Sequence, residues 1–152
     1  MKHASNASIA GHYHHRALES GVLRGSGGVF DGWQWWQGSD RLVWLPPGSS
    51  AVYKIGKRSA DANRNEHENL SRWRESGLAW APETSLIKVD GVPPGEQSIL
   101  VLIMPYYPEC ISSSGEIPDS ARAVAPDLLP ENFRRRHDGQ VMLIDAGDVA
   151  PY

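Results

Sequence analysis

Short apolar segments separated by glycine- and proline-rich turns fill the chain from residue 21 to residue 56. Aromatic and β-branched residues gather in 29–30, 33–36, 41–45 and 51–55, which is typical of strands. Residues 46–49, Pro-Pro-Gly-Ser, form a strong turn signal between the last two of these segments. The pattern predicts consecutive antiparallel strands joined by short turns.

A helical period replaces the strand pattern over residues 59–76. Leu70 and Trp73 lie three positions apart on one face, and Glu66 lies one turn before Leu70 on the same side. Gly77 follows directly, where a helix commonly ends on a glycine. We therefore expect one helix that packs on the sheet.

Strand signals return after the helix, at residues 85–89 and 98–104, and a further hairpin spans 134–144 with an Asp-Gly turn. Residues 107–123 are rich in serine and proline and predict a loop. Runs of strands with one helix packed on them favour an α+β fold.

Residues 1–20 are small and polar, and we expect them to form a mobile arm. His12, His14 and His15 could suggest a metal site, because histidine is a common metal ligand. No carboxylate or cysteine at ligand spacing accompanies them, so an irregular tail is the better interpretation.

Composition narrows the class of protein. A chain of 152 residues with 40% hydrophobic and 22% charged residues fits one globular domain. Its formal net charge of −3 makes a general nucleic-acid-binding protein a poor fit. The single cysteine, Cys110, excludes an internal disulfide and a cysteine-based zinc site. No membrane span or apolar signal segment is evident, so we expect a cytoplasmic protein, or one delivered into a host cell without a cleavable signal.

The C-terminal quarter carries the most specific motif. Asp127 precedes Asn132 by five positions, and Asp145 follows thirteen positions later, after the apolar run 141–144. Carboxylate and amide oxygens suit Mg²⁺, and a further carboxylate can accept a proton from an attacking hydroxyl. Taken alone, these residues fit ordinary turns equally well.

The segment DLLPENFRRRHDGQVMLIDAG resembles the catalytic loop and the following Asp-Phe-Gly stretch of protein kinases. Residues 52–55, Val-Tyr-Lys-Ile, resemble the strand that carries the phosphate-binding lysine of that superfamily. The resemblance implies an N-lobe at 21–107 and a strongly reduced C-lobe at 108–152, with ATP and Mg²⁺ as cofactors.

Each role follows from the resemblance. Asp127 would orient the acceptor hydroxyl, and Lys54 would bind phosphates while paired with a helix glutamate, Glu66 or alternatively Glu68. Asn132 and Asp145 would be the metal ligands. The implied nucleotide-binding residues are Gly38, Ser39, Lys54, Met104, Tyr106, Asn132 and Asp145.

The phosphate-covering glycine turn has two candidates. Residues 25–28, Gly-Ser-Gly-Gly, hold more glycine but lie far before Lys54. Gly38 and Ser39 lie closer to kinase spacing and are favoured, although only one glycine is present there.

The departures from the family pattern are substantial. Ala125 and Pro126 replace the His-Arg pair, Ala146 replaces the phenylalanine, and few residues separate Tyr107 from Asp127. This reduced plan resembles the minimal kinases of phages and bacterial effectors, including one family that phosphorylates a host chaperone.

We therefore expect a minimal protein Ser/Thr kinase that acts on a protein substrate, without nucleic-acid or membrane partners. A catalytically inactive pseudokinase and a small-molecule phosphotransferase remain alternatives. A partner or a second copy could cover the truncated C-terminal side.

Overall fold

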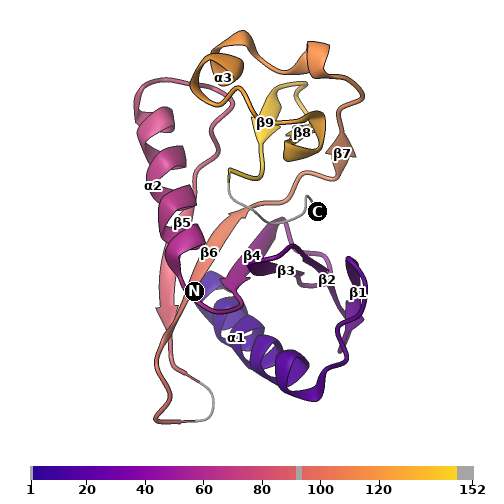
Figure 1. The fold of residues 1–152 in the computed structure, drawn as a ribbon, viewed down its shortest axis with the longest axis vertical. Helices are drawn as coiled ribbons and strands as arrows, with labels where there is room; N and C mark the ends of the chain where they lie inside the picture. The colour runs from indigo at the N-terminus through magenta and orange to yellow at the C-terminus, as the bar shows by residue number, and fades with distance from the viewer. Residues whose placement is uncertain (1, 92–93, 147–152) are drawn as a thin grey trace.

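An antiparallel six-stranded sheet forms the centre of the computed structural model, which describes residues 2–91 and 94–146 (Figure 1). Its strands are β1 (Gly27–Phe30), β2 (Trp33–Gln37), β3 (Arg41–Leu45), β4 (Ala51–Gly56), β5 (Ser85–Val89) and β6 (Ile99–Pro105). They lie in the order β1-β2-β3-β4-β6-β5, and every neighbouring pair is antiparallel. The strands predicted from the apolar segments are confirmed.

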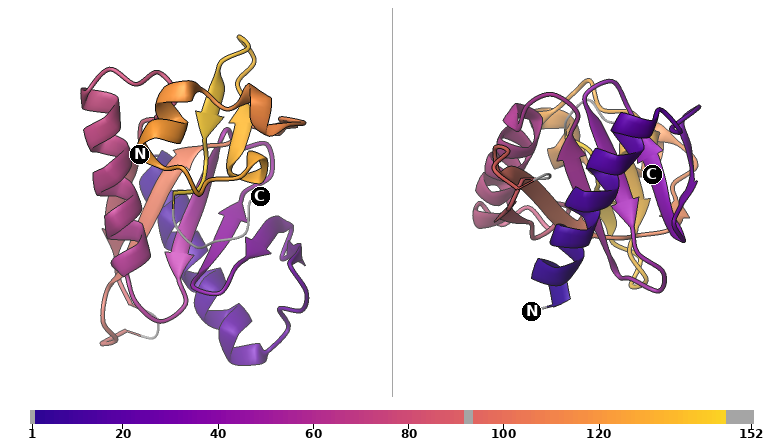
Figure 2. Two further views of the ribbon diagram at one scale, coloured as in Figure 1. Left: turned by 45° about the horizontal axis from the view of Figure 1, so that its top comes forward. Right: turned by 90° about the horizontal axis from the view of Figure 1, so that it is seen from below.

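Both faces of this sheet are covered. The helix α1 (Lys2–Ser20) crosses one face, as the view from below in Figure 2 shows, and α2 (Asp61–Glu75) packs on the other. Leu42 and Trp44 pack on the α1 side, whereas Val43 and Val52 pack on the α2 side. Because β3 is buried at every position, its sequence lacks the polar alternation of a half-exposed strand.

The expectation of a mobile arm at residues 1–20 is wrong for the part that the structure describes. Ala7, Ala10 and Ala17 of α1 are fully buried, at spacings of three and seven that place them on one helix face. Alanine lets the helix approach the sheet closely but adds little hydrophobicity, so the sequence pattern is weak. Two helices, instead of the expected one, therefore cover the sheet.

The helix α2 confirms the prediction for residues 59–76 within two residues at its start and one at its end. Leu70 is fully buried in the core, and Trp73 packs against Trp80 with ring centroids 5.4 Å apart. Gly77 has φ of 86° and donates its N–H to the carbonyl of Arg74, which ends the helix as expected.

A smaller layer follows the large sheet and lies at the top of Figure 1. It contains β7 (Glu109–Cys110), α3 (Asp119–Val124), β8 (Phe133–Arg135) and β9 (Val141–Leu143), with 3₁₀ turns at Ser114–Glu116 and Pro130–Asn132. The strands form a three-stranded antiparallel sheet, β7-β8-β9, and include the predicted hairpin.

One hydrophobic core joins this layer to the α2 side of the large sheet. Phe133 and Leu143 of the small layer are fully buried in the same cluster as Val52 and Leu70. The backbone N–H of Leu143 also donates to the carbonyl of Trp80 at 2.9 Å. The protein is therefore α+β, with an antiparallel sheet, few helices and a small second layer.

Candidate functional site

Four charged side chains meet between the large sheet, α2 and the end of β9. Lys54 Nζ lies 2.8 Å from Glu66 Oε1, and Arg41 Nη1 lies 3.1 Å from the same oxygen. Arg41 Nη2 lies 3.3 Å from Asp145 Oδ1. All four are at most 1% exposed. We refer to Arg41, Lys54, Glu66 and Asp145 as the ionic cluster.

Strand register explains how two cations reach the same place. Val43 of β3 lies opposite Lys54 of β4, so these two side chains share a face of the sheet. Arg41 lies two positions before Val43 and therefore projects from that same face. Glu66, on the inner side of α2, faces both cations.

The chain after β9 is attached to the cluster through its backbone. Lys54 Nζ donates to the carbonyl of Ile144 at 2.7 Å, and the N–H of Ala146 donates to Glu66 Oε2. These two contacts hold the backbone on either side of Asp145, which explains why a residue 104 positions from Arg41 in sequence joins the same cluster. Gly147, the last residue of the motif, lies outside the described residues.

Burial and charge pairing act in opposite directions on the groups of the cluster. Burial raises the pKa of Glu66, but attraction to Lys54 and Arg41 outweighs it and lowers the pKa to about 2. Burial lowers the pKa of Lys54, while the charge of Glu66 opposes this shift. Two cations facing two anions leave the cluster neutral as a set, which is the condition under which buried charges are tolerated.

The sequence analysis missed two members of this site, Arg41 and Asn63. Asn63 Nδ2 donates to the carbonyls of Lys54 and Leu100 at 2.9 and 3.1 Å, and its Oδ1 accepts from Arg41 Nη1 at 3.1 Å. The sequence contains a pattern that could have identified Asn63, because Asn63, Glu66 and Leu70 lie on one face of the predicted helix. Arg41 likewise occupies the inward register of an otherwise apolar strand.

The backbone brings Asn132 beside the cluster. Its carbonyl accepts the N–H of Ile144 at 2.8 Å. Its side-chain Oδ1 accepts the N–H of Leu129 at 2.9 Å and so stabilises the turn before β8. Asn132 is thus adjacent to the strand that leads to Asp145, with its amide oxygen engaged locally.

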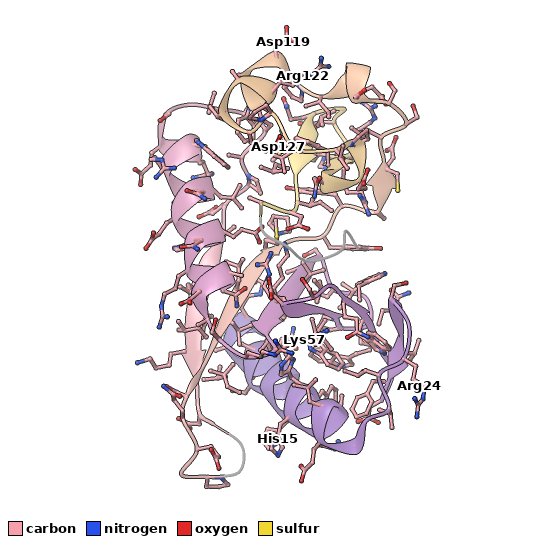
Figure 3. The ribbon with its side chains drawn as sticks, viewed as in Figure 1. His15, Arg24, Lys57, Asp119, Arg122 and Asp127 are labelled. Carbon is pink, nitrogen blue, oxygen red and sulfur yellow. The ribbon has the colours of Figure 1, made fainter. Side chains whose placement is uncertain are left out.

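Asp127 lies on the exposed loop after α3. Figure 3 shows it in the upper layer, well away from Lys57, which follows β4. Among the described residues, no hydrogen bond or ion pair connects its side chain to the ionic cluster. The same described ranges contain no group of three or more His, Cys, Asp and Glu side chains placed to hold a metal ion.

The two candidate glycine turns differ in their surroundings. A Cβ at Gly27 would lie 2.8 Å from the carbonyl oxygen of Trp35, so this glycine permits close pairing of β1 with β2. Gly38 instead begins the turn into β3. Its N–H donates to the carbonyl of Arg41 at 3.1 Å, and its carbonyl accepts from Lys57 Nζ at 2.7 Å. Ser39 is exposed at the tip of that turn.

Met104 and Tyr106 lie where β6 leads out of the large sheet. Met104 is buried opposite Val52, and the Tyr106 ring stacks on Trp36 with centroids 6.4 Å apart. Both residues border a cavity of about 710 Å³. Within the described part of the chain, its lining does not include Lys54, Glu66 or Asp145, so the cavity and the ionic cluster are separate features.

Comparisons with known proteins provide no family for this chain. No family model matches the sequence, and neither the curated proteins nor the solved structures give a significant match. In the described residues, none of the helices combines the length and the apolar character needed to span a membrane. Function is therefore inferred from the geometry of the site.

Proposed function

We propose that this protein is an ATP- and Mg²⁺-dependent phosphotransferase of reduced kinase-like architecture that transfers the γ-phosphate to a protein Ser/Thr hydroxyl. One observation carries the proposal: the buried Lys54–Glu66 pair links a strand to a helix and is attached to the backbone at Asp145. Phosphoryl transfer needs a positioned cation beside the phosphates and hard oxygen ligands for a metal, and this arrangement supplies both types of group together.

Lys54 is assigned to bind phosphate oxygens while Glu66 fixes its position. Asp145 and Asn132 supply carboxylate and amide oxygens, which fit Mg²⁺ by type, and a bound Mg²⁺ would offset phosphate charge. Arg41 forms an ion pair with Asp145, and the N–H of Leu129 donates to the side-chain oxygen of Asn132. A metal ion bound at Asp145 and Asn132 would therefore compete with these two contacts.

The remaining assignments concern the other parts of the nucleotide and the acceptor hydroxyl. The turn at Gly38 and Ser39 would cover the phosphates, since it leads directly into Arg41 and the strand beside Lys54. Met104 and Tyr106 would meet the base. Asp127 is solvent-exposed, which suits a residue that must reach the hydroxyl of a separate protein molecule.

A second candidate is a kinase-like binding module without turnover. The contact between Arg41 and Asp145 favours it, because a guanidinium already neutralises the carboxylate that the metal would need. The two candidates share the fold and differ in whether transfer occurs.

Incubation with γ-labelled ATP and Mg²⁺, followed by detection of self-labelling, tests the proposal. Replacing the proposed base in Asp127→Ala should lower transfer by about 10²–10⁴ and leave nucleotide binding intact. Asp119→Ala is the matched control, since Asp119 is an exposed aspartate in α3 of the same layer. Binding of MgATP without transfer by the native protein would favour the binding module, and no binding would refute the kinase proposal.

A further inference from the structure

Arg41 has a donor that the described structure leaves unused. A guanidinium carries five N–H donors in a planar fork. Nη1 donates to Asn63 and Glu66, and Nη2 donates to Asp145. Nε is buried and has no hydrogen-bond partner among the described residues. A buried donor without an acceptor is costly, so its presence indicates an acceptor that arrives from outside the chain.

The position of Arg41 points to the nature of that acceptor. Its carbonyl closes the turn that begins at Gly38, and its side chain shares a sheet face with Lys54. Arg41 therefore lies between the turn proposed to cover phosphates and the lysine proposed to bind them. An anionic oxygen bound by Lys54 would come close to both residues.

The chemistry of arginine also favours a phosphate. A guanidinium binds phosphate through two parallel N–H donors, whereas an ammonium acts as a point charge. A counter-ion needed only for folding would require a positive charge but no unused Nε donor. Glu66 already accepts from both Arg41 and Lys54, so it stays neutralised by Lys54 when Arg41 changes partner.

Building on the proposed nucleotide site, we propose that Arg41 is a second phosphate-binding residue, which exchanges Asp145 for phosphate oxygens when ATP binds. The exchange releases the Asp145 carboxylate at the moment when the phosphates arrive. Phosphate binding and the availability of Asp145 to a cation are then two consequences of one side-chain movement.

NMR titration with ATP and with adenosine, both in Mg²⁺, separates phosphate recognition from base recognition. In the native protein ATP should bind more tightly than adenosine. In Arg41→Gln we expect this preference to fall by roughly 10- to 100-fold, because hydrogen bonds to a charged group are lost, while adenosine affinity stays constant. Arg64→Gln removes an exposed arginine of α2 and should leave the preference unchanged.

Arg41→Lys is a second variant for the case in which Arg41→Gln does not fold. Lysine keeps the positive charge of the cluster but lacks the planar set of guanidinium N–H donors. If Arg41→Gln is unfolded by circular dichroism, a reduced ATP preference in Arg41→Lys supports the proposal. An unchanged preference in a folded Arg41 variant overturns the role of Arg41 and leaves the nucleotide site in place. Failure of the native protein to bind either ligand overturns the nucleotide site and this inference with it.

Discussion

At the scale of single residues, the ionic cluster depends on its balance of charge. Glu66 is the anion that Arg41 and Lys54 share, and all three side chains are fully buried. Removing one partner of such a set leaves an uncompensated charge in a medium that solvates it poorly. The cluster should therefore tolerate paired changes better than single ones.

Glu66→Gln should reduce the free energy of unfolding by about 3–5 kcal/mol, because two buried cations lose their common partner. Urea denaturation measures this loss. Glu68→Gln, an exposed change two positions away, should stay within about 0.5 kcal/mol of the native protein. The double variant Lys54→Met/Glu66→Gln should recover part of the loss. Equal effects of the two single glutamine variants would show that the cluster is not a charge-balanced unit.

A second residue-scale prediction concerns His14 of α1, which is 5% exposed. Trp44 donates its indole N–H to His14 Nδ1 at 3.4 Å, so the folded protein needs an unprotonated ring. Burial lowers the pKa of His14 to about 4, and the charges of Lys57 and His15 act in the same direction. Since the unfolded chain takes up this proton near pH 6.5, stability should decline as pH falls from about 6.5 to about 4.

The two pKa values correspond to a loss of about 3 kcal/mol across that pH interval. Thermal unfolding at a series of pH values measures it. His14→Gln should flatten the profile, while His12→Gln, an exposed histidine of the same helix, should keep it. A profile that His14→Gln leaves unaltered would rule out the proton linkage.

At the scale of elements, α1 supplies the cover for one face of the large sheet. Its contact surface consists mainly of alanines, with Ala10 fully buried against the sheet. Small side chains allow a close approach that larger or charged ones would prevent.

Ala10→Glu should lower the free energy of unfolding by about 3 kcal/mol or more, because it forces a charge into this interface. Ser8→Glu, at an exposed position of the same helix, is the matched control and should have little effect. Differential scanning calorimetry compares the two. Equal melting temperatures would mean that α1 is not packed as described.

Predictability from sequence differs between these elements for physical reasons. The strands were predictable because their apolar segments are bounded by turn residues. The helix α2 was predictable because its helical period is followed by Gly77 at the expected end. The helix α1 was missed because three of its buried positions, Ala7, Ala10 and Ala17, are alanines, whose burial adds little to a hydrophobic pattern. The contact between Lys54 and Glu66 was expected from the resemblance to the kinase motif, whereas Arg41 was missed because a charged residue in a strand usually faces solvent.

At the scale of the whole molecule, the site lies where the two layers meet. The large sheet contributes Arg41 and Lys54, α2 contributes Glu66, and the chain after β9 contributes Asp145. The left view of Figure 2 shows α2 running beside both layers. One hydrophobic core joins the two layers, and the N–H of Ile144, next to Asp145, donates to the carbonyl of Asn132 in the small layer.

The most direct measurement is calorimetric titration of the native protein with ATP, with and without Mg²⁺, alongside Asp145→Asn. We expect ATP to bind in Mg²⁺, and affinity to fall by at least about tenfold when Mg²⁺ is chelated or Asp145 is replaced, since a hard cation loses its carboxylate ligand. Asp127→Asn should bind like the native protein. Equal affinity in all these conditions, or no binding by the native protein, would contradict a metal-dependent nucleotide site at Asp145.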